Sequence, residues 1–397
     1  MHIIIPDNLD QIGLDLLAST EGVTFEAAKK MPRAELLQKA STADGLIVRS
    51  ATTVDAEMFA ALTQIKALAR AGVGVDNIDL NVATEHGVVV MNAPDGNSIA
   101  TAELTLALML ALARHVPQAH ADMSQGKWEK TAYLGTELRG KTLGIIGLGR
   151  VGQAVARRAQ AFEMHVIAHD PFLPAEVAAT LSVPLLTLEE VFARADYLTL
   201  HSVVSGDSAG LINAANIARM KDGVRIINAA RGKLVNEADL AAALQAGKVT
   251  GAAVDVYSVE PATVDNPLVG LPNVIKTPHL GASTVEAQEE VAVQAVRNLL
   301  DALLKQEYRN VMNPAVLALD LHGQALLGIG VAVVNVLIIA VYNIGQTRVM
   351  KGYHAMARAS AWTMTGGLAI AAVFVLLGGG VQLPPNAATW LALVGLV

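Results

Sequence analysis

A glycine-rich segment at residues 147–152 (GLGRVG) constrains the fold of this chain more than any other feature. It follows an apolar run at 141–146 (KTLGII), which predicts a buried strand, and it opens a segment with helical character. In such a unit Gly147 permits a tight turn, Gly149 lets backbone approach a pyrophosphate, and Gly152 lets the helix pack close to the strand. The helix N-terminus then presents free N–H groups to phosphates. Glycine-rich turns also occur without a ligand, so this segment alone leaves both interpretations open.

The next predicted strand, residues 164–168, indicates which dinucleotide would bind. It ends at His169 and Asp170, at the distance from the glycine segment where a ribose-binding carboxylate is expected. Asp170 would accept hydrogen bonds from the ribose hydroxyls and would repel a 2′-phosphate. The sequence therefore predicts NAD rather than NADP as the cofactor.

Three later segments, each at the end of a β-like run, carry an Arg, a Glu and a His in that order: 228–232 (NAARG), 255–261 (DVYSVEP) and 277–282 (TPHLGA). Oxidising a 2-hydroxy acid requires a base for the hydroxyl proton and a cation for the carboxylate. His279 is the predicted base, because imidazole titrates near neutral pH. Glu260 would hydrogen-bond the other ring nitrogen and raise the pKa of the imidazole. Arg231 would bind the substrate carboxylate at two points and polarise the keto oxygen.

Each of these three residues also has a plain structural interpretation. A His after Pro can cap a loop, a Glu before Pro can belong to a solvated turn, and an Arg next to Gly can contact a helix end. Taken singly, each residue is better explained that way. The three together, in this order and behind a dinucleotide segment, favour the catalytic interpretation.

Further segments extend the pattern over most of the chain. They are 47–54 (IVRSATTV), 70–79 (RAGVGVDNID), 96–103 (GNSIATAE) and 126–129 (GKWE). With all these segments in order, residues 1–317 resemble the D-isomer-specific 2-hydroxyacid dehydrogenases, and among them the branch that oxidises D-3-phosphoglycerate. The resemblance implies NAD-dependent conversion of D-3-phosphoglycerate to 3-phosphohydroxypyruvate, the first step of serine biosynthesis. A glyoxylate, hydroxypyruvate or other D-2-hydroxyacid dehydrogenase is the alternative, and an NAD-responsive binding module is a remote one.

The resemblance also implies which residues contact cofactor and substrate. Asp255, after the predicted strand 251–254, would bind the nicotinamide carboxamide, unless it only caps that strand. Backbone N–H groups around Val73 and Gly74 would hold the substrate carboxylate, unless the glycine serves only a turn. Arg49 is the candidate for a substrate phosphate, because a guanidinium suits a dianion. The expected cofactor-binding residues are Gly147, Gly149, Arg150, Val151, Gly152, Asp170, His201, Val203, Ala229, Ala230, Arg231, Asp255, His279, Gly281 and Ala282; the expected substrate-binding residues are Arg49, Ser50, Val73, Gly74, Asn97, Arg231 and His279; no metal ligand is expected.

Two features depart from the family pattern. Where a His-x-Pro stretch usually shapes the adenine and ribose wall, this chain has His201, Ser202 and Val203, so the proline is absent. No segment resembles the regulatory ACT domain that many phosphoglycerate dehydrogenases carry. Serine feedback through such a domain is therefore not expected.

The domain organisation follows from two long predicted helices. Residues 98–116, after a plausible N-cap at Asn97, form an apolar helix that leads toward the 141–146 strand, and residues 284–304 form another. The resemblance implies that the second helix returns the chain to its first domain. We therefore expect an α/β fold with two Rossmann-like domains and parallel sheets: a discontinuous substrate domain (1–97 and 290–317) and an NAD-binding domain (98–289).

Composition limits the partners. A net charge of −7 without a basic run argues against nucleic acid, and the absence of cysteine excludes disulfides and thiol catalysis. The opening residues (MHIIIP) read as a strand rather than a signal segment, so the catalytic part is expected in the cytoplasm. The expected partners are a small 2-hydroxy acid and further copies of this chain, as a homodimer or homotetramer.

The remaining residues are of another kind. Segments 325–344 and 362–383 are long and uncharged, about the length needed to cross a bilayer, and 387–397 begins a third apolar run. Buried core helices are the alternative, but the composition favours membrane spans. The tail, 318–397, resembles part of an EamA-type drug/metabolite transporter repeat. The basic loop between the two spans would face outward behind a cytoplasmic enzyme, which suggests a fusion, a truncated reading frame or an assembly artefact rather than an evolved anchor.

Overall fold

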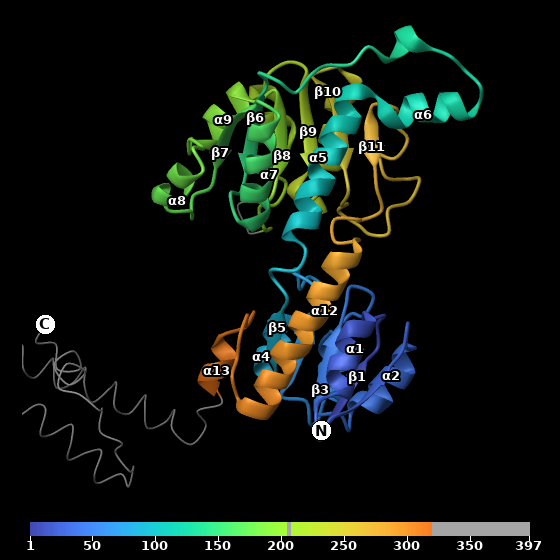
Figure 1. Cartoon of the computed structure of the whole chain (residues 1–397), viewed down its shortest axis with the longest axis vertical. Coiled ribbons are helices and arrows are strands. Elements are labelled where there is room, and N and C mark those ends of the chain that lie inside the picture. The colour runs from blue at the N-terminus through green and yellow to red at the C-terminus, as the bar shows by residue number, and fades with distance from the viewer. Residues whose placement is uncertain (205–207, 320–397) are drawn as a thin grey trace, which may run out of the picture. The chain divides into compact units, whose positions relative to one another are not determined.

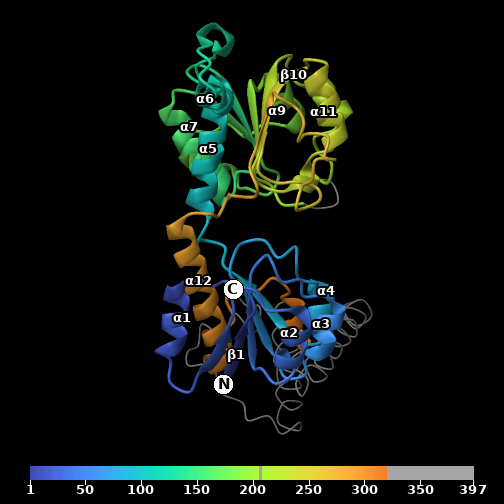
Figure 2. The same ribbon diagram turned by 90° about the vertical axis from the view of Figure 1, so that its right-hand side faces the viewer.

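The computed structural model describes residues 1–204 and 208–319, and two parallel sheets organise them. The first sheet has the order β2-β1-β3-β4-β5. Helices cover both of its faces, with α1 and α12 on one side and α2, α3 and α4 on the other (Figure 2). Its strands are β1 (His2–Ile5), β2 (Thr24–Ala27), β3 (Gly45–Val48), β4 (Ala67–Arg70) and β5 (Val89–Asn92), and its helices are α1 (Gln11–Ala18), α2 (Arg33–Ala40), α3 (Ala56–Ala61), α4 (Leu80–Glu85) and α12 (Val285–Leu300).

The second sheet has the order β11-β10-β9-β8-β6-β7, again with parallel neighbours (Figure 1). The order reverses at β6, so ligands are expected outside the carboxyl ends of β6 and β8. Its strands are β6 (Thr142–Ile146), β7 (His165–His169), β8 (Tyr197–Leu200), β9 (Val224–Asn228), β10 (Val249–Val254) and β11 (Val274–Lys276). Its helices are α5 (Ser98–Arg114), α6 (Val116–Ser124), η1 (Lys130–Tyr133), α7 (Arg150–Ala161), α8 (Ala175–Thr180), α9 (Leu188–Arg194), α10 (Ala214–Arg219), η2 (Gly232–Leu234) and α11 (Glu237–Gln245).

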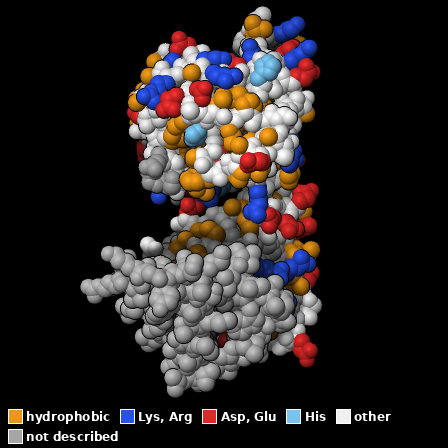
Figure 3. Space-filling model, turned by 90° about the vertical axis from the view of Figure 1, so that its left-hand side faces the viewer, with side chains coloured by type: hydrophobic (Ala, Val, Ile, Leu, Met, Phe, Trp, Pro, Cys, Tyr) orange, Lys and Arg blue, Asp and Glu red, His pale blue; other side chains and the backbone are white. Residues whose placement is uncertain are grey.

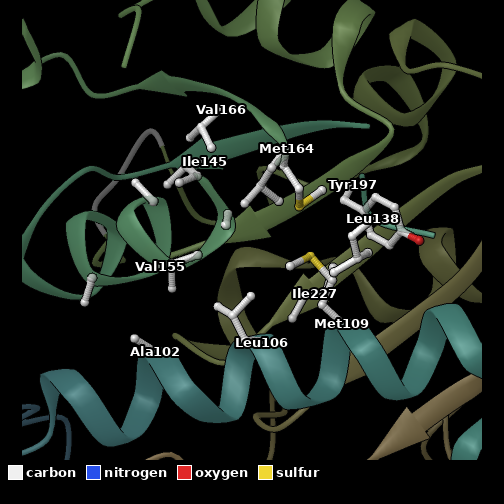
Figure 4. Close-up of a cluster of buried hydrophobic side chains, with 14 of the residues drawn as sticks. Ala102, Leu106, Met109, Leu138, Ile145, Val155, Met164, Val166, Tyr197 and Ile227 are labelled. Carbon is white, nitrogen blue, oxygen red and sulfur yellow. The ribbon is translucent and has the colours of Figure 1, made fainter. Parts of the chain in front are cut away.

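A hydrophobic core fills each side of the second sheet. On one side Leu106 and Met109 of α5 lie against Ile145, Tyr197 and Ile227 from the strands (Figure 4). Because both faces of the sheet are covered, its strands are nearly continuous apolar runs rather than alternating ones. The arrangement places the polar strand ends, and not the strand faces, where chemistry can occur.

The predicted long helices differ from the observed ones at their ends. The helix expected over 98–116 stops at Arg114, because His115 adopts a left-handed conformation (φ 54°) that ends the helical ladder and starts α6. Asn97 is at the N-cap position of α5, but its side chain makes no capping hydrogen bond. The helix expected over 284–304 begins after the capping Thr284, and its last turn widens into a π-helical segment, η3 (Asp301–Lys305).

The chain after η3 returns to the first sheet. Met312 N–H donates to Val90 O (2.8 Å), and the Asn313 side chain accepts from Val90 N–H (2.9 Å) and donates to Val88 O (2.9 Å). Val311 forms an antiparallel bridge with Met91, and α13 (Ala315–Leu319) follows. Helix α12 packs on α1 and on β3, β4 and β5. Residues 285–316 therefore belong to the packing of the first sheet.

Residues 1–316 form one compact unit. The proposed spans at 325–344 and 362–383, the run at 387–397 and the resemblance to a transporter repeat lie outside the described residues. Within residues 1–204 and 208–319 we find no single helix that is long and apolar enough to cross a membrane; α5 and α6, which meet at a bend of 66°, meet the length and composition criteria only as a pair. On the face drawn in Figure 3, acidic and basic side chains of the described residues are interspersed.

Candidate active site

The glycine segment forms a close turn between β6 and α7. Gly147 has a φ of 90°, and a Cβ on Gly152 would lie 2.2 Å from the Gly147 carbonyl oxygen, so the first turn of α7 packs directly on the loop. A Cβ on Gly149 would meet nothing within 4 Å. The N–H groups that open α7 have no partner one turn earlier, because a helix leaves its first donors free. The turn thus leaves open space beside a helix N-terminus, which suits a pyrophosphate.

Asp170, after β7, is tied to this turn. One carboxylate oxygen accepts from Leu148 N–H (2.8 Å), and the other accepts from the N–H groups of Phe172 (3.0 Å) and Leu173 (3.1 Å). The carboxylate therefore fixes the glycine loop in addition to any ribose contact. The sequence alone did not indicate this second role.

Two buried polar atoms at the end of β8 point to a cofactor site. Nδ1 of His201 and Oγ of Ser202 are buried without a hydrogen-bond partner in the described part of the chain, while the other ring nitrogen of His201 lies 2.9 Å from Thr199 Oγ1. Burial lowers the pKa of His201 to about 3, so its ring is neutral. Gly147 lies directly against the backbone of His201 and Ser202. Unpaired buried polar atoms beside a phosphate loop fit a bound dinucleotide, because a ligand would satisfy them.

Ser202 was missed by sequence reasoning, which selected its neighbours His201 and Val203. Val203 is 75% exposed, whereas the Ser202 hydroxyl is buried. The available signal was its position, two residues after the end of β8, the strand that neighbours β6 at the point where the strand order reverses.

His279 and Glu260 form a hydrogen-bonded pair. His279 Nδ1 lies 2.7 Å from one carboxylate oxygen of Glu260, and the other oxygen accepts from Tyr257 N–H (3.0 Å). The bond to Glu260 raises the pKa of His279, against burial and the charge of Arg231, which lower it. Burial would raise the pKa of Glu260, but the hydrogen bonds from His279 and Tyr257 outweigh it and lower that pKa. Within residues 1–204 and 208–319 only Nδ1 of the His279 ring forms a hydrogen bond, so Nε2 can exchange a proton with a ligand.

Asp255 holds the backbone of the segment that carries His279. Its carboxylate is fully buried and accepts from Thr277 Oγ1 (2.6 Å), Leu280 N–H (2.7 Å) and Gly281 N–H (2.8 Å). His279, whose φ is 56°, donates its own N–H to the Asp255 carbonyl (2.9 Å). Asp255 is therefore more than a strand cap, since it shapes the loop on which the base lies.

Arg231 follows β9 and reaches the loop after β4. Its Nε lies 3.0 Å from Asp76, Nη1 donates to Ala230 O (2.8 Å), and Nη2 lies against Gly74. Asn228 fixes this turn, because its side chain donates to Arg231 O (2.9 Å) and accepts from Ala230 N–H (3.1 Å). The structure thus brings Arg231 and Gly74 together, as residues that bind one carboxylate require.

The expected substrate residues of the first sheet lie at its carboxyl edge. Arg49, after β3, donates to Asn8 O (2.6 Å) and contacts Gln288 of α12, and burial lowers its pKa. Val73 accepts from the Asn92 side chain (2.7 Å), and Ser50 is exposed. Arg70, which ends β4, was not selected from the sequence. Its Nε is buried without a partner in the described part of the chain, and burial together with the charge of Arg231 lowers its pKa to about 10.

Arg49 and Arg231 therefore follow β3 and β9, Arg70 ends β4, and the charges of Arg49 and Arg231 both lower the pKa of Arg70. The signal for Arg70 was its place at the head of the 70–79 segment, in which the sequence predicts a role only for Val73 and Gly74. Mutually repelling guanidinium groups favour a ligand with more than one negative charge.

Known proteins resemble this chain over most of its length. Residues 106–281 match the model of the D-isomer specific 2-hydroxyacid dehydrogenase NAD-binding domain. The chain is 45% identical to a D-3-phosphoglycerate dehydrogenase of Archaeoglobus fulgidus over 313 residues (79% of this chain, 59% of the relative) and 48% identical to one of Bacillus subtilis over 299 residues (75% and 56%). It thus spans little more than half the length of these curated relatives.

Solved structures show the same fold. TT0316 protein from Thermus thermophilus matches with a TM-score of 0.71 and 38% identity, covering 79% of this chain and all of that one. A glyoxylate reductase from Paecilomyes thermophila matches with a TM-score of 0.72 and 30% identity, covering 79% and 98%. The cofactor is NAD, as the matched domain model states and as the glycine turn of β6 and α7 suits. On these matches the chain belongs to the D-isomer specific 2-hydroxyacid dehydrogenase family.

Proposed function

We propose that this chain oxidises D-3-phosphoglycerate to 3-phosphohydroxypyruvate with NAD. The observation that carries the proposal is the His279–Glu260 pair (2.7 Å) in the same site as Arg231, with Arg49 and Arg70 beyond it at the edge of the first sheet. The curated relatives are D-3-phosphoglycerate dehydrogenases, which supports this substrate.

The proton leaves the substrate hydroxyl through His279. Glu260 accepts from Nδ1, so Nε2 carries the free lone pair and takes the C2 hydroxyl proton as the carbonyl forms. The Glu260 carboxylate then stabilises the imidazolium. In the reverse direction the same nitrogen returns the proton. When bound, NAD supplies the hydride-accepting chemistry.

Different arginines bind the two anionic ends of the substrate. Arg231, with the backbone of Val73 and Gly74, binds the C1 carboxylate and polarises the C2 oxygen. Arg49 binds the phosphate, and Arg70, with its unpaired Nε, adds positive charge between them. Ser50 and Asn97 are proposed as further contacts, which the family resemblance supports.

The cofactor contacts follow the second sheet. Phosphates lie on the turn of Gly147, Gly149 and Gly152, and Asp170 selects NAD over NADP at the ribose. His201, Ser202 and Val203 line the adenine and ribose wall. The further contacts are Arg150, Val151, Ala229, Ala230, Asp255, Gly281 and Ala282. The domain division 1–97 with 290–317 and 98–289, and assembly as a homodimer or homotetramer in the cytoplasm, are part of this proposal.

The test is an NADH-forming assay of the purified full chain with D-3-phosphoglycerate, run beside glyoxylate, hydroxypyruvate and unphosphorylated D-2-hydroxy acids. We expect the largest kcat/KM for the phosphorylated acid. His279→Ala should lower turnover by about 10²–10⁴ while NAD still binds, because that is the usual contribution of a general base. Preference for an unphosphorylated acid would favour the glyoxylate or hydroxypyruvate alternative, and NAD binding without turnover of any acid would favour the binding-module alternative.

A further inference from the structure

The loop that carries Glu260 has little apolar anchoring, because within 258–265 only Ala262 packs, partly buried, against the core of the second sheet. From 258 to 265 every residue except Ala262 is exposed, with Val259 at 74% and Val264 at 86%. Hydrophobic packing thus holds the loop weakly, although the Glu260 carboxylate must meet His279 with hydrogen-bond accuracy. Polar contacts therefore have to hold the loop in the conformation that places Glu260 on His279.

Glu237 makes those contacts from the first turn of α11. One carboxylate oxygen accepts from Ser258 N–H (2.9 Å), and the other accepts from Ser258 Oγ (2.6 Å) and the Asn266 side chain (3.0 Å). It therefore grips both ends of the loop. Hydrogen bonds to an ionised acceptor are stronger than neutral ones, so this single side chain can offset the missing packing.

Tyr257, the residue before the loop, is held by a different set of contacts. A Cβ on Gly232, the residue after Arg231, would lie 1.9 Å from the Tyr257 carbonyl group, so η2 and Tyr257 are in direct backbone contact. Tyr257 in turn donates its N–H to Glu260 (3.0 Å) and its hydroxyl to Thr277 O (3.1 Å). Tyr257 thus contacts the segments that carry Arg231, Glu260 and His279. Glu237 holds Ser258, the residue that follows Tyr257.

We propose that Glu237 is a positioning residue for the catalytic pair: it clamps Ser258 and Asn266 so that the Glu260 carboxylate stays on Nδ1 of His279. The inference rests on the proposed function for its kinetic consequence, but the geometry it asserts exists without turnover. Glu237 itself touches neither His279 nor Arg231 in the contacts described.

Loss of the clamp has a defined sign. The charged groups that face His279 are Glu260 and Asp255, which raise its pKa, and Arg231, which lowers it. Because Glu260 contributes most, a loop that lets it drift lowers the pKa of His279 toward its ordinary value. The acidic limb of kcat/KM for oxidation, which needs neutral His279, should then move to lower pH. A defect confined to stability would leave the limb in place.

The experiment compares Glu237→Gln with Asp239→Asn in the full chain. Asp239 is a matched control, since it lies in the same first turn, loses the same charge, and holds Ala214 N–H of α10 (2.9 Å) rather than the loop. We expect Glu237→Gln to lower kcat by about tenfold, part of a general base's contribution, and to shift the limb to lower pH. Asp239→Asn should do neither, and the NAD affinity of both variants should stay near that of the wild type.

A titration of the His279 ring by NMR, with NAD bound and no substrate, separates this inference from the proposed function. If the wild type turns over no acid, the function fails, yet a lowered His279 pKa in Glu237→Gln would still support the clamp. Unchanged His279 titration in a folded Glu237→Gln protein would overturn the clamp. Should that variant unfold, Ser258→Ala combined with Asn266→Ala removes two of the three donors and tests the same prediction.

Discussion

At the scale of single residues, the pKa of His279 links structure to rate. The hydrogen bond that His279 donates to Glu260 raises this pKa, so oxidation should lose rate as pH falls through a value above the ordinary one of about 6.5. Reduction needs the protonated ring and should lose rate as pH rises through the same value. Rate profiles in both directions check this, and we expect Glu260→Gln to move both limbs to lower pH. Limbs that stay in place would assign them to another group.

Arg49 makes a separate residue-scale prediction about specificity. Arg49→Ala should raise KM for D-3-phosphoglycerate by about tenfold to a hundredfold, the usual worth of a hydrogen bond to a charged group, and raise KM for an unphosphorylated acid far less. Arg33→Ala is the control, because Arg33 pairs with Asp55 and Glu57 on the surface of the same sheet region. Equal losses for both substrates would mean that Arg49 only holds Asn8 and Gln288 in place.

Some of the residues discussed above could be predicted from the sequence, and others could not. Arg231, Glu260 and His279 could be selected because their chemistry and order are specific, and the structure brings Glu260 to His279. Glu237 could not, since its contacts with Ser258 span 21 positions and depend on where α11 begins. Ser202 and Arg70 were visible in the sequence, but only the fold reveals that each has a buried polar atom with no partner among the described residues.

At the scale of elements, the β6–α7 turn separates two roles of glycine. Gly152→Ala would force a Cβ to within 2.2 Å of Gly147 O, and we expect it to destabilise the fold by about 1–3 kcal/mol and to weaken NAD binding. Gly149→Ala meets open space at an ordinary φ of −70°, so stability should change by less than about 1 kcal/mol. Its Cβ would nevertheless occupy space meant for the pyrophosphate. Thermal melts and NAD titrations check the pair; equal NAD affinity in Gly149→Ala and wild type would contradict the assignment.

The sequence predicts the ends of two strands to within one residue. The strand expected over 141–146 is β6 at 142–146, and the one expected over 164–168 is β7 at 165–169. The end of α5 was not predictable in this way, because the apolar pattern continues past Arg114 while the backbone of His115 turns left-handed. The π-helical widening after Leu300 likewise leaves no mark in the residue pattern.

For the molecule as a whole, the segment 310–316 pairs with the edge strand β5 and completes the packing of the first sheet. A chain shortened to end after residue 319 should fold like the full chain and retain activity, because every proposed site residue and the contacts of Asn313 and Val316 remain. Ending after residue 309 should cost at least about 3 kcal/mol, since it removes hydrogen bonds to Val88 and Val90 worth about 1 kcal/mol each and a buried valine. Denaturant unfolding of both shortened chains and the full chain decides; equal stability of the two shortened chains would show that this segment is dispensable.

The ion pair between Arg231 and Asp76 changes how ligand binding should be understood for the whole unit. Arg231 follows a strand of the second sheet and Asp76 a strand of the first, so this pair is an electrostatic link between them. Where the substrate carboxylate takes the Nε–H group that Asp76 holds (3.0 Å), it displaces a protein carboxylate, and binding becomes an exchange of anions rather than the neutralisation of a free cation. The number of ion pairs is then the same before and after, which makes the affinity for the carboxylate end less sensitive to salt than its charge suggests. Asp76 also competes with the product carboxylate for Arg231.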